Sequence, residues 1–205
     1  MLSIIQAAGW PIWPLILCSV VGLALIIERL MSLRNARVAP PLLVDEVLSI
    51  SRGNLPAMDV VNKLGENSVL GMVLASGLRA MIVEPRTSER MLRQTFELSG
   101  RTAAQHLERY LNTLGTIAAA APLLGLLGTV VGMIEIFGSQ TPGGSNPQQL
   151  AHGISIALYN TGFGLVIAMP SMIFWRHFRA TVDGLVVEME QQAIRLVEVV
   201  HGDRR

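Results

Sequence analysis

Long apolar stretches alternate along this chain with segments of ordinary polarity. The first stretch, 13–31, carries charge only at its far end. About 20 helical residues, at roughly 1.5 Å each, cross a hydrocarbon core of about 30 Å. The second apolar region, 113–175, is long enough for two such helices. Gly, Pro, Ser and Asn crowd its middle, which predicts a loop at 138–151 between helices at 113–137 and 152–175.

A cleaved signal peptide is the alternative to a first membrane helix. Signal peptides carry basic residues ahead of their apolar run. In this chain no Lys or Arg precedes Arg29. The sequence therefore favours a membrane helix that is retained.

The charged residues are confined to two segments, and this predicts the topology. All 16 Lys and Arg residues fall in 28–109 and 176–205, which together hold 30 of the chain's 31 charged residues. Basic loops stay on the cytoplasmic side of a membrane. We therefore expect 1–12 and 138–151 outside, with 32–112 and 176–205 in the cytoplasm. Trp10 and Trp13 at the outer end of the first helix, and Trp175 at the inner end of the third, fit an aromatic belt.

Turn residues divide the segment 32–112 into short helical pieces. The predicted helices lie at about 42–51, 56–64 and 68–83. No stretch shows sustained alternation of apolar and polar positions, so we expect no β-sheet.

Two further apolar stripes recur every three or four residues and run into the second and third membrane helices. The first comprises Leu92, Phe96, Ser99, Ala103, Leu107, Tyr110 and Leu114, and the second Phe178, Val182, Leu185, Met189, Ala193, Leu196 and Val200. No helix breaker interrupts the first stripe, so we expect one helix from about 88 to 137. The expected fold is an all-α membrane protein with three transmembrane helices and long cytoplasmic extensions of the second and third.

Composition excludes several function classes. The chain is 51% hydrophobic and 15% charged, which argues against a soluble enzyme or a disordered chain. A net charge of +1 gives no reason to expect nucleic-acid binding, and the single Cys18 forms no internal disulfide. We find no phosphate-binding loop and no metal-ligand spacing, so no catalytic residue, metal or cofactor is expected. An intramembrane dyad of His152 and Ser155 is a disfavoured alternative.

Few polar groups lie inside the second and third apolar helices. Glu135 is their only carboxylate, and it marks either an ion path or the outer membrane interface. The Thr129 hydroxyl either serves a function or bonds to a carbonyl of its own helix. Small residues near these groups predict close helix approach: Gly125, Gly128 and Gly132 in the second helix, and Ala157, Thr161, Gly164 and Ala168 in the third.

Two motifs in these helices resemble those of the MotA/TolQ/ExbB proton-channel family, ExbB/TolQ branch. Ala121 to Val130 reads APLLGLLGTV and is similar to the family's A-P-x-x-G-L-x-G-T-V. Ala157-Leu158, Thr161, Gly164-Leu165 and Pro170 resemble its A-L-x-x-T-x-x-G-L…P pattern. The predicted topology is also that of this branch, whereas the MotA branch has four membrane helices.

The resemblance implies a non-enzymatic stator subunit of a proton-driven motor in the bacterial inner membrane. Such subunits form a homopentamer in membrane lipid, around two copies of an ExbD/TolR-like single-span protein with an essential Asp. The motor drives a TonB-like protein in outer-membrane transport or, as the alternative, a TolA-like protein in envelope constriction. ExbB-like is our preferred branch. A non-conducting membrane scaffold is the alternative from another class.

The resemblance also implies roles for particular residues. Thr129 and Thr161 would be pore hydroxyls near the partner's Asp, since a hydroxyl relays protons without adding charge. Glu135 and Asn160 are further candidates for the pore or its mouth. The residues expected to serve helix packing are Pro122, Gly125, Gly128, Gly132, Gly164 and Pro170. Many relatives carry an acidic residue where this chain has Ile156, so the partner's Asp would be the titrating group, and the sequence leaves H⁺ and Na⁺ both open.

Overall fold

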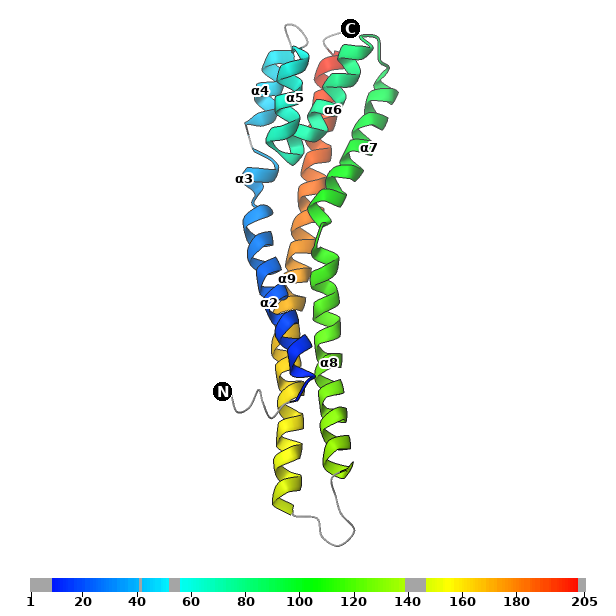
Figure 1. Ribbon diagram of the computed structural model, residues 1–205. Coiled ribbons are helices and arrows are strands. Elements are labelled where there is room, and N and C mark those ends of the chain that lie inside the picture. Colours follow the sequence, from blue (N-terminus) through cyan, green and yellow to red (C-terminus); the bar gives the residue numbers. More distant parts are fainter. Residues whose placement is uncertain (1–8, 41, 52–55, 139–146, 203–205) are drawn as a thin grey trace. The chain divides into compact units, whose positions relative to one another are not determined.

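All secondary structure in the described part of the chain is helical. The computed structural model describes residues 9–40, 42–51, 56–138 and 147–202 (Figure 1). Its helices are α2 (Ile12–Ser32), α3 (Asn35–Val38), α4 (Leu43–Ser51), α5 (Met58–Asn67), α6 (Val69–Val83), α7 (Glu89–Glu108), α8 (Leu111–Gly138) and α9 (Pro147–Gly202). The all-α prediction is confirmed, and α4, α5 and α6 agree with the three short helices expected from the turn residues.

Three helices are long and apolar enough to cross a membrane, as predicted. They are Ile12–Ser32, Leu111–Gly138 and the stretch Gly153–Val199 of α9. The range predicted as a loop, 138–151, overlaps a described helix at each end, since Gly138 still belongs to α8 and α9 begins at Pro147. Proline suits a first helical position, where its missing N–H has no intrahelical partner to lose. Residues 139–146 lie outside the described part.

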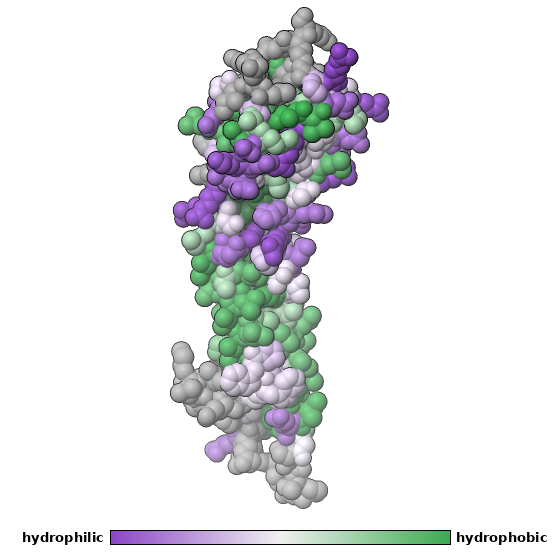
Figure 2. Space-filling view, turned by 45° about the horizontal axis from the view of Figure 1, so that its top comes forward, coloured by the Kyte–Doolittle hydropathy of each residue, from purple (hydrophilic) through white to green (hydrophobic). Residues whose placement is uncertain are grey.

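Helices α2, α8 and the first part of α9 form one compact unit, built from Met1–Glu28 and Tyr110–His177. Leu15, Ala121 and Ala168 form a buried cluster in it, with Leu124 and Ile167 packed alongside. Most of the large apolar side chains of this unit point outward instead, and they dominate its surface on the face shown in Figure 2. An apolar surface of this extent is stable only when lipid or another protein covers it.

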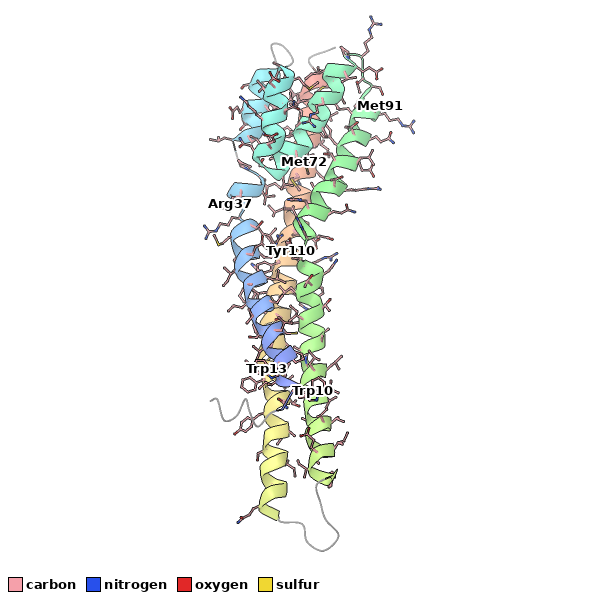
Figure 3. All side chains as sticks on the ribbon, viewed as in Figure 1. Trp10, Trp13, Arg37, Met72, Met91 and Tyr110 are labelled. Carbon is pink, nitrogen blue, oxygen red and sulfur yellow. The ribbon has the colours of Figure 1, made fainter. Side chains whose placement is uncertain are left out.

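The three tryptophans occupy different environments. Trp10 is 59% exposed and Trp13 66%, at the start of α2 (Figure 3), which suits the predicted aromatic belt. Trp175 is half-buried and packs on α8, where a Cβ added to Gly115 would lie 2.9 Å from the indole Nε1. Trp175 thus packs between two helices of this unit, which the belt prediction did not anticipate.

The second compact unit consists of Arg29–Arg109 and Phe178–Arg205. Helix α6 lies at its centre, with Leu70, Leu74 and Leu78 almost completely buried. Ser68 and Ser88 cap α6 and α7, since their hydroxyls accept hydrogen bonds from the third residue of each helix. The predicted stripe on α9 is buried at Phe178, Val182, Leu185, Met189, Ala193 and Leu196, whereas the Val200 side chain lies outside the described part.

The predicted continuous helix from 88 to 137 is wrong. Helix α7 ends at Glu108, α8 begins at Leu111, and Tyr110 between them has a left-handed backbone with φ 69°. The non-helical residues change the phase of the apolar stripe, so that Leu111 is fully buried and Tyr110 is 41% exposed. Neither Gly nor Pro marks this break, which is why the sequence pattern did not reveal it.

Candidate ion-path site

The backbones of α8 and α9 lie in direct contact within the first unit. A Cβ added to Gly125 would come 2.8 Å from the Asn160 carbonyl oxygen and 3.0 Å from the Thr161 Cα. A Cβ added to Gly164 would come 2.6 Å from the carbonyl oxygen of Ala121. Only glycine fits at both positions, because backbone atoms cannot move aside as a flexible side chain does. We call this contact between α8 and α9 the glycine seam.

Asn160 lies inside the glycine seam. Its side chain is 1% exposed, and a Cβ on Gly128 would come 2.7 Å from its Cβ and Nδ2. Gly132, one turn further on, has ordinary spacing of 3.5 Å to the Ala157 Cβ. The sequence offered Asn160 as a residue of the pore or its mouth, and the structure places it between α8 and α9.

Thr161 connects the two helices through its hydroxyl. The Oγ1 atom donates a hydrogen bond of 3.3 Å to the Gly125 carbonyl of α8, and the residue is half-buried. Hydroxyl-to-backbone bonds between helices are typical of membrane bundles with close contacts.

Thr129 lies in a different environment on α8. Its Oγ1 donates 2.7 Å to the Leu126 carbonyl of its own helix, as one of the two sequence-based interpretations expects. The residue also lines an open groove with Val130, Met133, Ile134, Phe137 and Gly138. The two threonines therefore differ: Thr161 faces the glycine seam, and Thr129 borders an exposed apolar surface.

The other candidate residues named from the sequence lie either near the end of a helix or within one. Glu135 is exposed in the last turn of α8, a position that suits a membrane interface. Pro122 and Pro170 sit inside α8 and α9, which continue past them. Among the described residues, no group of three His, Cys, Asp or Glu side chains is placed to hold a metal ion. The side chains of His152 and Ile156 lie outside the described part.

Gly22 and Ser171 form a contact that the sequence analysis missed. Ser171 is 98% buried, and its hydroxyl donates 2.8 Å to the Ile167 carbonyl. A Cβ on Gly22 of α2 would lie 3.4 Å from that Oγ. The glycine inside an apolar helix is the signal that could have revealed this contact, since small residues let membrane helices approach.

Comparison with known proteins identifies the family. A sequence profile of the MotA/TolQ/ExbB proton channel family matches residues 65–191, more than half of the chain. The chain belongs to this family. It is therefore a multi-pass membrane protein with three candidate spans, a transport-channel subunit and not an enzyme. The His152–Ser155 dyad is thereby set aside.

Relatives within the MotA/TolQ/ExbB family carry ExbB names. A Synechocystis sp. protein named biopolymer transport protein ExbB-like 3 is 33% identical over 178 residues, 85% of this chain and 83% of the relative. Biopolymer transport protein exbB1 of Vibrio cholerae is 31% identical over 82% of this chain and 74% of its own length. ExbB of Aquifex aeolicus is 27% identical over 71% of this chain and 95% of its own length. The chain is accordingly an ExbB-like member of the family of biopolymer transport systems.

Proposed function

We propose that this chain is the inner-membrane stator subunit of a proton-driven motor that energises outer-membrane transport through a TonB-like protein. In this proposal five copies surround an ExbD-like single-span partner whose Asp carries the proton. The residues 1–12 and 138–151 face the periplasm, and 32–112 and 176–205 face the cytoplasm. The basic segments support this orientation, because all 16 Lys and Arg residues lie in 28–109 and 176–205.

The observation that carries the proposal is the position of Thr129. Its side chain borders an exposed groove of purely apolar character apart from the hydroxyl itself. A single-span helix from a partner fits such a surface, because apolar side chains of one helix pack into the grooves of another. A hydroxyl on that surface offers the partner's carboxyl a hydrogen bond within a region where water is scarce.

Thr161 is the second hydroxyl of the proposed ion path, and it lies on the neighbouring helix at the glycine seam, outside the groove that Thr129 lines. Its hydroxyl donates a hydrogen bond of 3.3 Å to the Gly125 carbonyl. A hydroxyl oxygen also accepts hydrogen bonds through two lone pairs, so Thr161 stays available to water or a protonated carboxyl. This chain has Ile156 where many relatives carry an acidic residue. Thr129 and Thr161 are therefore the polar side chains of the proposed ion path that this chain shares with the family motifs.

A non-conducting scaffold is the second candidate, and one observation favours it. The Thr129 hydroxyl is satisfied within its own helix at 2.7 Å, as a structural threonine would be. The Thr116 hydroxyl of the same helix makes an equivalent bond of 2.8 Å to the Asn112 carbonyl. Thr116 therefore provides the matched control that separates the two functions.

The test is proton flux into liposomes that contain the chain together with its copurified single-span partner. Thr129→Val and Thr161→Val combined should abolish partner-dependent flux, while the complex still copurifies. Thr116→Val should leave the flux unchanged. Unchanged flux in the double variant refutes the pore assignment and favours the scaffold.

A further inference from the structure

The break between α7 and α8 is not favoured by the residues that form it. Arg109 has an extended backbone (φ −50°, ψ 133°), and Tyr110 is left-handed with φ 69°. A bulky residue is unfavourable in that conformation, because its Cβ crowds the backbone carbonyl. The sequence alone favours one uninterrupted helix through this point. Contacts with other parts of the chain must therefore stabilise the broken conformation.

Arg29, in the last turn of α2, makes such a contact. Its side chain is 5% exposed, and Nη1 donates 3.1 Å to the carbonyl of Leu107 in the last turn of α7. In an uninterrupted α-helix the carbonyl of residue 107 accepts the N–H of Leu111, four residues later. Arg29 thus supplies the Leu107 carbonyl with a donor at the point where α7 ends. Guanidinium groups suit this role, since they carry several fixed donors and remain charged.

We propose that Arg29 is a helix cap that keeps this junction broken, and that the junction is a two-state conformational device. In one state Arg29 caps Leu107 and Tyr110 is left-handed. In the other the Leu111 N–H takes the Leu107 carbonyl, Tyr110 becomes helical, and 89–138 form one helix. The strain at Tyr110 opposes the first state, and the Arg29 hydrogen bond stabilises it. This inference concerns the junction alone and is independent of the proposed channel.

Amide hydrogen exchange of the full-length protein in lipid nanodiscs separates the two states. The first N–H groups of a helix have no intrahelical acceptor, so the amides of Leu111, Asn112 and Thr113 should exchange rapidly in the capped state. Arg29→Met removes the donor, and these three amides should then exchange at least tenfold more slowly. Arg29→Lys retains a donor and should preserve rapid exchange.

Arg179→Met is the matched control. Arg179 also reaches the end of α7, but through a 3.6 Å ion pair with the Glu108 carboxylate and not through a backbone carbonyl. This variant should leave the exchange of Leu111, Asn112 and Thr113 unchanged. Slowed exchange in Arg179→Met, or unchanged exchange in Arg29→Met, overturns the proposal.

Tyr110→Gly tests the same idea in a variant that keeps the buried arginine. Glycine is comfortable in a left-handed position but weakens a continuous helix. The variant should raise the melting temperature by a few degrees, and added to Arg29→Met it should restore rapid exchange. A lower melting temperature for Tyr110→Gly contradicts the broken, capped state, including in the case where Arg29→Met does not fold.

Discussion

The Asn160 side chain fills the space that a side chain on Gly128 would need. A Cβ at Gly128 would come 2.7 Å from the asparagine, and Asn160 is buried to 99%. A polar group therefore sits at a close contact between two apolar helices, where glycine leaves room for it. The distance between α8 and α9 at this point therefore depends on having glycine at 128 and asparagine at 160.

Gly128→Ala should destabilise the protein by about 2 kcal/mol, because the added methyl overlaps the Asn160 side chain in a packed site. The melting temperature in nanodiscs measures the effect. Gly132→Ala, one turn away with 3.5 Å to the nearest atom, is the control and should change the stability little. Equal shifts for the two variants would show that the glycine seam is looser than described.

Gly164→Ala should be at least as harmful, since its Cβ would meet the Ala121 carbonyl at 2.6 Å and backbone cannot rotate away. We expect a loss of about 2 kcal/mol or more. Gly162→Ala, two residues earlier on the same helix, has no atom within 4 Å and should not lower the stability. The same thermal measurement checks both, and a stable Gly164→Ala protein would argue against direct backbone contact.

Gly77→Ala tests the second unit. A methyl there would collide with the ring of Phe96, which is buried where α6 and α7 pack. The free energy of unfolding should fall by about 2 kcal/mol. Gly100→Ala on α7 has open space around it and should raise stability by about 0.5–1 kcal/mol through better helix propensity. Denaturant unfolding distinguishes them, and the prediction fails if both variants shift in the same direction.

The apolar pattern predicted the helices well because burial in lipid or in a core decides where they form. Helix α9 runs through Pro170 without interruption, as membrane helices can. The loop was predicted to extend to 151, past the start of α9 at Pro147, because a proline suits a turn as well as a first helical position. Local patterns carry this much information because each helix needs its own apolar face.

The local pattern of apolar and polar residues could not predict contacts between residues that lie far apart in the sequence. In our proposal the break at Tyr110 depends on Arg29, 81 positions earlier in the chain. No residue next to the break indicates that the helix ends there. The small-residue pattern predicted close approach at Gly125 and Gly164. For the same reason it could not predict that Asn160 lies inside the contact or that Trp175 covers Gly115.

Partner-dependent proton flux is the most direct test of the central claim. The chain should be reconstituted into liposomes alone, with its single-span partner, and with a partner whose membrane Asp is changed to Asn. We predict flux only with the intact partner, because the residues that line the apolar groove supply the Thr129 hydroxyl and no titrating carboxylate. Flux from the chain alone, or equal flux with the Asn partner, would contradict the account.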